Sequence, residues 1–337
     1  MMNYNIHLAD KQNEFIDKFK KRYIRAHKLK IKLFDFWDSF PYRVDGRVIK
    51  SDEFYEKMKK NVFDCGNFLE FKAGVGNDKI RLDRANFCKK DKLCLTCSIG
   101  RAYNQQKKFF QALEVYPYEN DDDLLSKYWY YIVTPVRHSP DESLEIVFNR
   151  SDALRKSALM QMRDGRRGKS DGFWSQFNGG MGSIEFTFTR NGWNVHINWL
   201  VNSDNRVQLY EVEDKRGKKW YQNELLERFL KRFNDSYIHS ISELSFDDRE
   251  QIRENLLEVL KYSLKFSSLE PHQLVMLYYF LYRKRLFFTF GNLRGLDLES
   301  VNEVSIGDDF EEGEEFIKLI YRRLPDLKYK LDFVDVL

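Results

Sequence analysis

The chain has 337 residues, of which 42% are hydrophobic and 32% are charged, and its formal net charge is only +4. This length supports one large domain or two smaller ones, while so small a net charge gives no global indication of an acidic or basic partner. No run of about 18 apolar residues occurs, so no membrane span is expected. The first residues, MMNYNIHLADKQNEF, lack the apolar core of a signal peptide. We therefore expect a cytoplasmic protein without a membrane partner.

Two short segments are locally basic. Residues 11–33 place Phe15, Phe19 and Tyr23 at helical spacing, which predicts an amphipathic helix within a basic, largely helical segment 1–60. Residues 163–169 combine cations with glycines, which predicts a loop. Both segments could contact the phosphates of a nucleic acid, although a solvated helix face explains the first equally well. The candidate phosphate-binding residues are Lys20, Lys21, Arg22, Arg25, Arg163, Arg166, Arg167 and Lys169.

All four cysteines of the chain lie within one short segment. Cys94 and Cys97 form a C-x2-C pair, the spacing with which two thiolates bind one tetrahedral ion, and Cys65 and Cys88 precede them. Because disulfides are rare in a reducing compartment, we predict a structural Zn²⁺ site with these four ligands. The site would belong to a zinc-binding module at residues 61–125, which includes a helix from residue 99 to about 113. The alternative is four unrelated buried thiols.

Strands and helices mix without a regular βαβ pattern, which predicts an α+β fold with an antiparallel sheet. The expected elements are a strand at 128–136, a helix at 143–163, a hairpin at 182–201, helices at about 222–233, 247–266 and 271–283, and a strand at 285–290. Residues 303–315 are acidic. We expect residues 297–337 to form an acidic linker and a C-terminal helix or tail.

The hairpin carries polar residues on one face. Both arms of GSIEFTFTRNGWNVHINWLV (182–201) alternate apolar and polar residues, and Asn-Gly between them indicates a tight turn that pairs Arg190 with Trp193. In that register Glu185 lies directly across from Asn198, with His196 as a diagonal neighbour. A carboxylate, an imidazole and an amide oxygen that converge on one sheet face indicate a metal site.

A second set of polar residues lies on the predicted helix 247–266. Its leucines form one stripe, and at 100° per residue Glu258, Tyr262 and Lys265 cluster on the opposite face. A tyrosine beside a carboxylate and an ammonium could act as a nucleophile, with Lys265 stabilising a phenolate or a phosphate. The alternative is an exposed helix face whose tyrosine is an ordinary surface aromatic.

These segments, in this order, resemble the rolling-circle plasmid replication initiators, a branch of the HUH endonuclease superfamily. The resemblance covers DCGNFLEF (64–71), ANFCKKDKLCLTCSIGRA (85–102), YYIVTPV (130–136), the hairpin, EVLKYSLK (258–265) and RKRLFFTFGNLRG (283–295). It implies an HUH-type nicking endonuclease core, an antiparallel sheet with packed helices, at residues 126–296 and after the cysteine module.

The resemblance also implies roles for single residues. Tyr262 would attack a backbone phosphate of origin DNA and form a 5′-phosphotyrosine link, Glu258 would act as a base, and Lys265 would assist. Glu185 and His196 would bind the divalent ion that polarises the phosphate. The implied partners are single-stranded or hairpin origin DNA and a host helicase and polymerase, and a homodimer is compatible with them.

The chain departs from the family pattern at Asn198, where a second histidine is expected. An amide oxygen is a weaker and harder ligand than imidazole, so Asn198 favours Mg²⁺ or Mn²⁺ and lower affinity. This departure leaves open a DNA-binding regulator that has lost nicking. A transposase or relaxase with the same chemistry is a third alternative, although the order of the motifs suits replication initiators better.

Overall fold

The structure is a computed structural model of the chain. It describes residues 8–37, 43–44, 47–48, 52–90, 92, 94–119, 128–213, 217, 219–233, 240–244, 256, 259, 269–281, 284–295, 306–307, 311, 314–326 and 328–336. These residues form a mixed α+β fold with antiparallel sheets, as predicted. None of the described helices is long and apolar enough to cross a membrane.

The chain divides into two compact units that differ from the four segments expected from the sequence. Unit 1 comprises Met1–Asn104, Glu270–Tyr279 and Ser300–Leu337, and unit 2 comprises Gln105–Leu269 and Phe280–Glu299. The basic N-terminal segment, the cysteines and the C-terminal residues therefore belong to one unit. Helix α3 (Leu95–Glu119) begins in unit 1 and ends in unit 2.

Unit 1 is built on a five-stranded antiparallel sheet with the order β12-β4-β3-β13-β14. Its strands are β3 (Phe68–Gly74), β4 (Ile80–Ala85), β12 (Ile306–Gly307), β13 (Phe316–Arg323) and β14 (Tyr329–Val336). The prediction of a C-terminal helix or tail is therefore wrong for the described residues. FIKLIYRR of β13 alternates in burial as a strand does, and it pairs with β3 with Phe71 opposite Leu319.

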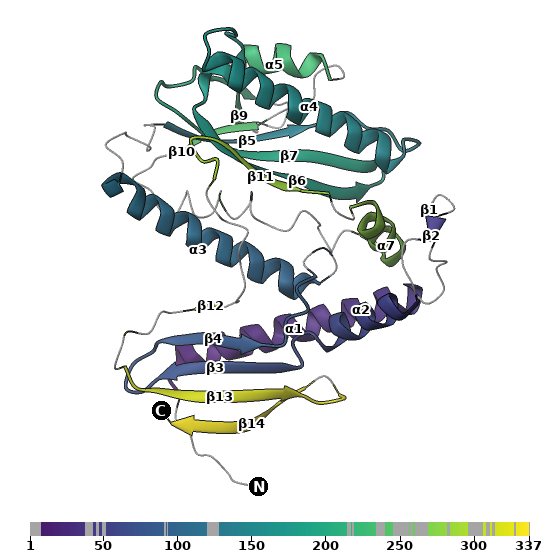
Figure 1. Ribbon diagram of the computed structural model, residues 1–337, viewed down its shortest axis with the longest axis vertical. Helices are drawn as coiled ribbons and strands as arrows, with labels where there is room; N and C mark the ends of the chain where they lie inside the picture. The colour runs from purple at the N-terminus through teal and green to yellow at the C-terminus, as the bar shows by residue number, and fades with distance from the viewer. Residues whose placement is uncertain are drawn as a thin grey trace. The chain divides into compact units, whose positions relative to one another are not determined.

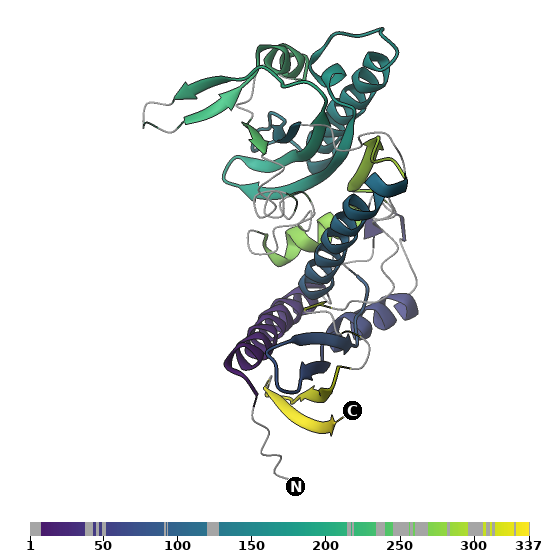
Figure 2. The same cartoon turned by 90° about the vertical axis from the view of Figure 1, so that its left-hand side faces the viewer.

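Helix α1 packs on this sheet because one face of the helix is apolar. Helix α1 (Asp10–Trp37) buries Ile16, Phe19 and Tyr23 against Phe71 and the neighbouring strand residues, and Figures 1 and 2 show α1 running alongside the sheet. The remaining elements of this unit are α2 (Asp52–Asp64), α7 (Pro271–Phe280) and a two-stranded sheet of β1 (Arg43–Val44) and β2 (Arg47–Val48). The basic N-terminal helix is thus part of a packed core.

Unit 2 is built on a seven-stranded sheet with the order β11-β6-β7-β5-β10-β9-β8. Its strands are β5 (Tyr128–Pro135), β6 (Gly179–Thr189), β7 (Gly192–Ser203), β8 (Tyr210–Glu213), β9 (Lys219–Gln222), β10 (Ser240–Leu244) and β11 (Phe287–Gly291). Its helices are α4 (Leu144–Gly165), the short 3-10 turn η1 (Phe173–Gln176) and α5 (Glu224–Lys231). All strand pairs described are antiparallel.

The two faces of the central hairpin are separated as the sequence predicted. Ile184, Phe186 and Trp199 lie on a buried apolar face, where Phe148 of α4 stacks on Phe186 and Trp174 of η1 packs on Trp199. Figure 1 shows α4 lying across this sheet. The opposite face carries the polar residues of β6 and β7.

The hairpin register differs from the predicted one by two residues. Thr189 pairs with Gly192 and Phe188 with Trp193, so Glu185 lies directly opposite His196, and Asn198 lies opposite Ser183. The cause is the turn: the left-handed residue is Gly192, with φ +88°, while Asn191 has no positive φ. This arrangement is typical of loops that end in a left-handed glycine bulge instead of a two-residue primed turn. Because the shift is even, each side chain stays on its predicted face.

Candidate metal centres

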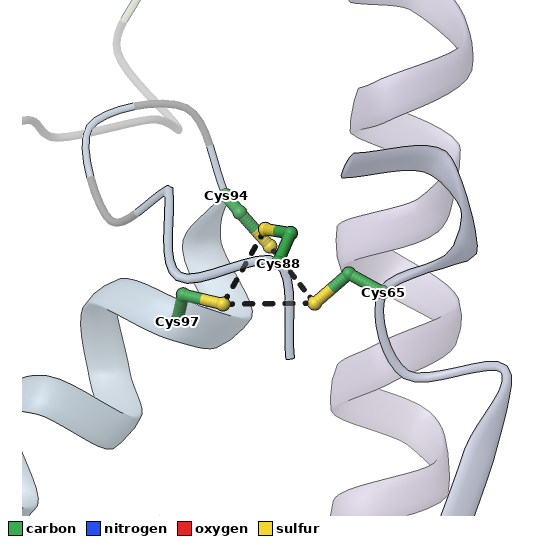
Figure 3. A group of neighbouring side chains, drawn as sticks. All are labelled: Cys65, Cys88, Cys94 and Cys97. Atoms are coloured by element: carbon green, nitrogen blue, oxygen red, sulfur yellow. Dashed lines mark hydrogen bonds between the residues drawn. The ribbon is translucent and has the colours of Figure 1, made fainter. Parts of the chain in front are cut away.

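The four cysteines come together in unit 1, as predicted. Cys65 follows α2, Cys88 lies between β4 and α3, and Cys94 and Cys97 lie at the start of α3. Figure 3 shows their side chains pointing toward a common centre. The Sγ atoms of Cys65 and Cys97 are 3.6 Å apart, those of Cys88 and Cys97 3.5 Å, and those of Cys94 and Cys65 3.6 Å.

This geometry fits a tetrahedral metal. Zn–S bonds of about 2.3 Å place the sulfurs of a tetrahedral site about 3.8 Å apart, close to the 3.5–3.6 Å separations found here. All four sulfurs lie within 4.8 Å of one another, and all four thiols are free. The cluster can therefore bind a metal such as Zn²⁺. Among the described residues it is the one group of three or more Cys, His, Asp or Glu side chains arranged in this way.

Hydrogen bonds within the cluster shift the pKa values of its thiols in opposite directions. Hydrogen bonding to Cys65 and the other thiols holds the pKa of Cys94 well below its usual value, and a hydrogen bond with Cys88 lowers the pKa of Cys65. Hydrogen bonding with Cys65 raises the pKa values of Cys88 and Cys97. Hydrogen bonding thus favours deprotonation of Cys94 and Cys65 and opposes it at Cys88 and Cys97, and metal binding requires deprotonated ligands.

Helix α1 contributes residues that the sequence analysis missed. The buried Lys30 donates a hydrogen bond of 3.0 Å from Nζ to the carbonyl oxygen of Cys65. The next residue, Gly66, has φ +77°, and a Cβ there would lie 2.1 Å from the ring of Tyr23. Only the fold reveals these contacts, because a buried lysine cannot be told from its exposed neighbours in a basic run. They tie α1 to the cysteine cluster.

A second group of the predicted ligands lies on the polar face of the β6–β7 hairpin. His196 Nε2 is 3.0 Å from Glu185 Oε2, and Asn198 Nδ2 donates to the same oxygen at 2.9 Å. Glu185 and Asn198 are buried, and the His196 side chain is 13% exposed. The three residues thus converge on one carboxylate oxygen, within a single pair of strands.

The amide of Asn198 is oriented by a residue of the neighbouring strand. Tyr131 of β5 donates its hydroxyl to Asn198 Oδ1 at 3.0 Å, so the amide NH₂ points to the carboxylate. In this arrangement Asn198 positions Glu185, while its oxygen faces Tyr131. The sequence analysis missed Tyr131, since its place beside Asn198 depends on how β5 pairs with β7.

The predicted nucleophile and its two neighbours lie outside the part of the chain that the structure describes. Glu258, Tyr262 and Lys265 are outside the described residues. Of the predicted helix 247–266, the structure describes Leu256 and Val259, which are both helical and buried. The geometry of the tyrosine relative to the hairpin therefore remains a prediction.

The candidate phosphate-binding residues fall into two groups. Lys20 lies 3.8 Å from the centre of the Tyr321 ring, and Arg22 packs over the Phe19 ring at 5.3 Å, so both cover the core of unit 1. Desolvation by this packing lowers the pKa of Lys20, although Asp17 acts against it. Lys21 and Arg25 are exposed. At the end of α4, Arg163 pairs with Asp164, and the exposed residues of the loop are Arg166, Arg167 and Lys169.

Comparisons of the chain with protein-family models, with curated proteins and with solved structures find no match.

Proposed function

We propose that this protein nicks and rejoins single-stranded origin DNA in rolling-circle replication of a plasmid or a similar element. The observation that carries the proposal is the convergence of Glu185, His196 and Asn198 on one face of an antiparallel sheet. In this arrangement Glu185 and His196 offer one divalent ion a hard and a borderline ligand. Unit 2 would then be an HUH-type core, with the cysteine cluster as a structural zinc site in the other unit.

The residues of the hairpin would bind and orient the metal. Glu185 and His196 supply two ligand atoms, and a reversed amide would add the oxygen of Asn198. The amide oxygen of Asn198 is a weaker and harder ligand than imidazole, so the expected ion is Mg²⁺ or Mn²⁺. When bound, such an ion polarises a phosphoryl oxygen and stabilises the charge that develops on it.

Tyr262, on the predicted helix 247–266, would carry out the covalent step. The phenolate oxygen of Tyr262 attacks the scissile phosphorus, the bond to the 3′ oxygen breaks, and the products are a 5′-phosphotyrosine and a free 3′-hydroxyl. Glu258 would accept a proton or activate the nucleophile that ends a round, and Lys265 would stabilise negative charge. The free 3′-hydroxyl would prime a host polymerase, with a host helicase opening the duplex.

A nicking assay tests this proposal. Labelled single-stranded oligonucleotides from the origin of the protein's own element are incubated with Mg²⁺ or Mn²⁺ and with the wild type, Tyr262→Phe or Tyr210→Phe. Tyr210 is an exposed tyrosine of β8, so its loss of a hydroxyl is a matched control. We expect a shortened product and a protein-linked 5′ fragment from the wild type and from Tyr210→Phe, and neither product from Tyr262→Phe.

The orientation of Asn198 favours a second candidate, a DNA-binding regulator related to such initiators. Its NH₂ group and the His196 ring both engage Glu185, which a metal would have to displace. Binding without cleavage in either metal would support the regulator, and cleavage restored by Asn198→His would identify the amide as the cause. Cleavage that persists in Tyr262→Phe would contradict Tyr262 as the nucleophile of this protein, whether it is an initiator, a transposase or a relaxase.

A further inference from the structure

The exposed face of α1 carries a straight line of cations. Its members follow a 3-4-3-4 spacing and are all exposed: Lys18, Lys21, Arg25, Lys28 and Lys32. At 100° per residue they lie within an arc of about 80°, and they extend over about 21 Å of helix. We call these residues the α1 stripe. The opposite side of the same helix holds Ile16, Phe19 and Tyr23 in the core.

The α1 stripe is not neutralised by its own helix. The acidic residues Asp10, Glu14 and Asp17 precede it, and no acid follows until Asp35. Within the described part of the chain, no ion pair joins a stripe residue to an acidic side chain. Helix α4 differs, since its cations are matched by acids: the pairs are Arg150 with Glu142, and Arg155 and Lys156 with Asp152. The stripe is therefore a concentrated source of positive potential.

The stripe is held rigidly. Three aromatic or aliphatic anchors bury the inner face of α1 against the sheet, and Lys30 bonds the turn of the cysteine cluster. Tyr23 packs against Gly66 beside the same cluster. A helix fixed at its core and at a metal site presents its surface cations without the ordering cost that a flexible basic arm would have.

We propose that unit 1 binds the phosphate backbone of duplex DNA through the α1 stripe. A duplex as long as the stripe carries about 12 phosphates, so each cation has a phosphate within reach. Proteins that hold single strands add aromatic rings on which bases stack, but Phe19, Tyr23 and Phe34 of α1 are buried. The stripe consists of four lysines and one arginine, side chains that commonly contact phosphate oxygens. It is suited to backbone contact that positions the protein and does not read sequence.

This inference rests on the proposed function only for its choice of DNA over other polyanions, and it does not use the nicking chemistry. The site also differs from the residues expected from the sequence, because Lys20 and Arg22 cover the core, while Lys18, Lys28 and Lys32 join Lys21 and Arg25. Its role would be to anchor the protein on the duplex part of an origin.

The test measures binding to a short labelled duplex of arbitrary sequence as salt is varied. The full chain carries Tyr262→Phe and no divalent metal is added, so nicking cannot affect the result. A triple variant, Lys21→Gln with Arg25→Gln and Lys28→Gln, removes charges from the stripe while keeping good helix formers. The control is Lys57→Gln with Lys60→Gln and Lys330→Gln, three exposed lysines of unit 1 outside α1.

Removal of three phosphate contacts should reduce the slope of log K against log salt by about 2.7, since each contact contributes about 0.9. We expect this loss in the stripe variant and little change in the control. Equal slopes in the two variants would overturn the inference, as would preference for a single strand over the duplex or for anionic phospholipid vesicles over either. Duplex binding through the stripe by a wild-type protein that does not nick origin DNA would retain this inference and reject the proposed nuclease.

Discussion

Removal of the metal from the cysteine cluster should destabilise unit 1 in particular. The perturbation is either a chelator or Cys97→Ser, because Cys97 contacts both Cys65 and Cys88. The neighbouring substitution Ser98→Ala, at another buried residue of α3, is a matched control that leaves all four thiols in place. Loss of a bound ion should free the turn at Cys65 on which Lys30 and Tyr23 of α1 pack.

The geometry sets the size of the effect. The sulfur separations of 3.5–3.6 Å are within a few tenths of an ångström of the roughly 3.8 Å of a tetrahedral zinc site, so binding requires little rearrangement. Free metal at about 1,000 times Kd stabilises a folded protein by about 4 kcal/mol. Structural zinc sites in small peptides reach about 10–16 kcal/mol. We expect a value close to the smaller one here, because the aromatic core around Phe71 remains when the metal is lost.

The assay combines metal analysis with hydrogen exchange. The wild type and Ser98→Ala should contain one zinc per chain, and replacement by Co²⁺ should give the absorption of a tetrahedral thiolate site. On chelation, the amides of α1, β3 and β13 should lose protection, while those of β6 and β7 in unit 2 should not. Zinc content of the wild type well below one per chain, or equal content in Cys97→Ser and the wild type, would refute the four-thiolate site.

Two further predictions concern stability. Burial, assisted by Arg323 and Lys30, lowers the pKa of His27 from 6.5 to about 4. On acidification the unfolded chain therefore binds a proton at a higher pH than the folded chain does. The free energy of unfolding should fall by about 2 kcal/mol as the pH drops from about 7.5 to 5. Denaturant melts of His27→Gln should lack this part of the pH dependence, and parallel curves for the two proteins would contradict the assignment. Gly192→Ala should lower the free energy of unfolding more than Gly168→Ala does. Both glycines have a positive φ, of +88° and +66°, but only at Gly192 would a Cβ lie close to another atom, the Ser139 carbonyl oxygen at 2.7 Å. The backbone strain alone is worth about 1–2 kcal/mol, and equal losses in thermal melts would show that the hairpin turn relaxes away from Ser139.

The predicted elements that held were those with a strong local pattern. The strand at 128–136, the helix at 143–163 and the two faces of the hairpin correspond to β5, α4 and the β6–β7 pair. Helix α4 also begins where the sequence offers a cap, since Ser143 accepts from the backbone of Ile146. Patterns of this kind act over a few residues, so the sequence carries them directly.

The sequence by itself determined which side chains share a face and that Cys94 and Cys97 have the spacing of a metal-binding pair. Only the tertiary structure decided the hairpin register, because a shift of two residues leaves every side chain on the same face and the turn conformation at Gly192 selects one of the two. It alone decided that β13 pairs with β3, with Leu319 opposite Phe71, and that the sulfurs of the four predicted cysteines lie within 4.8 Å of one another. Contacts between residues so far apart in the chain depend on the packing of the whole unit, and no local periodicity encodes them.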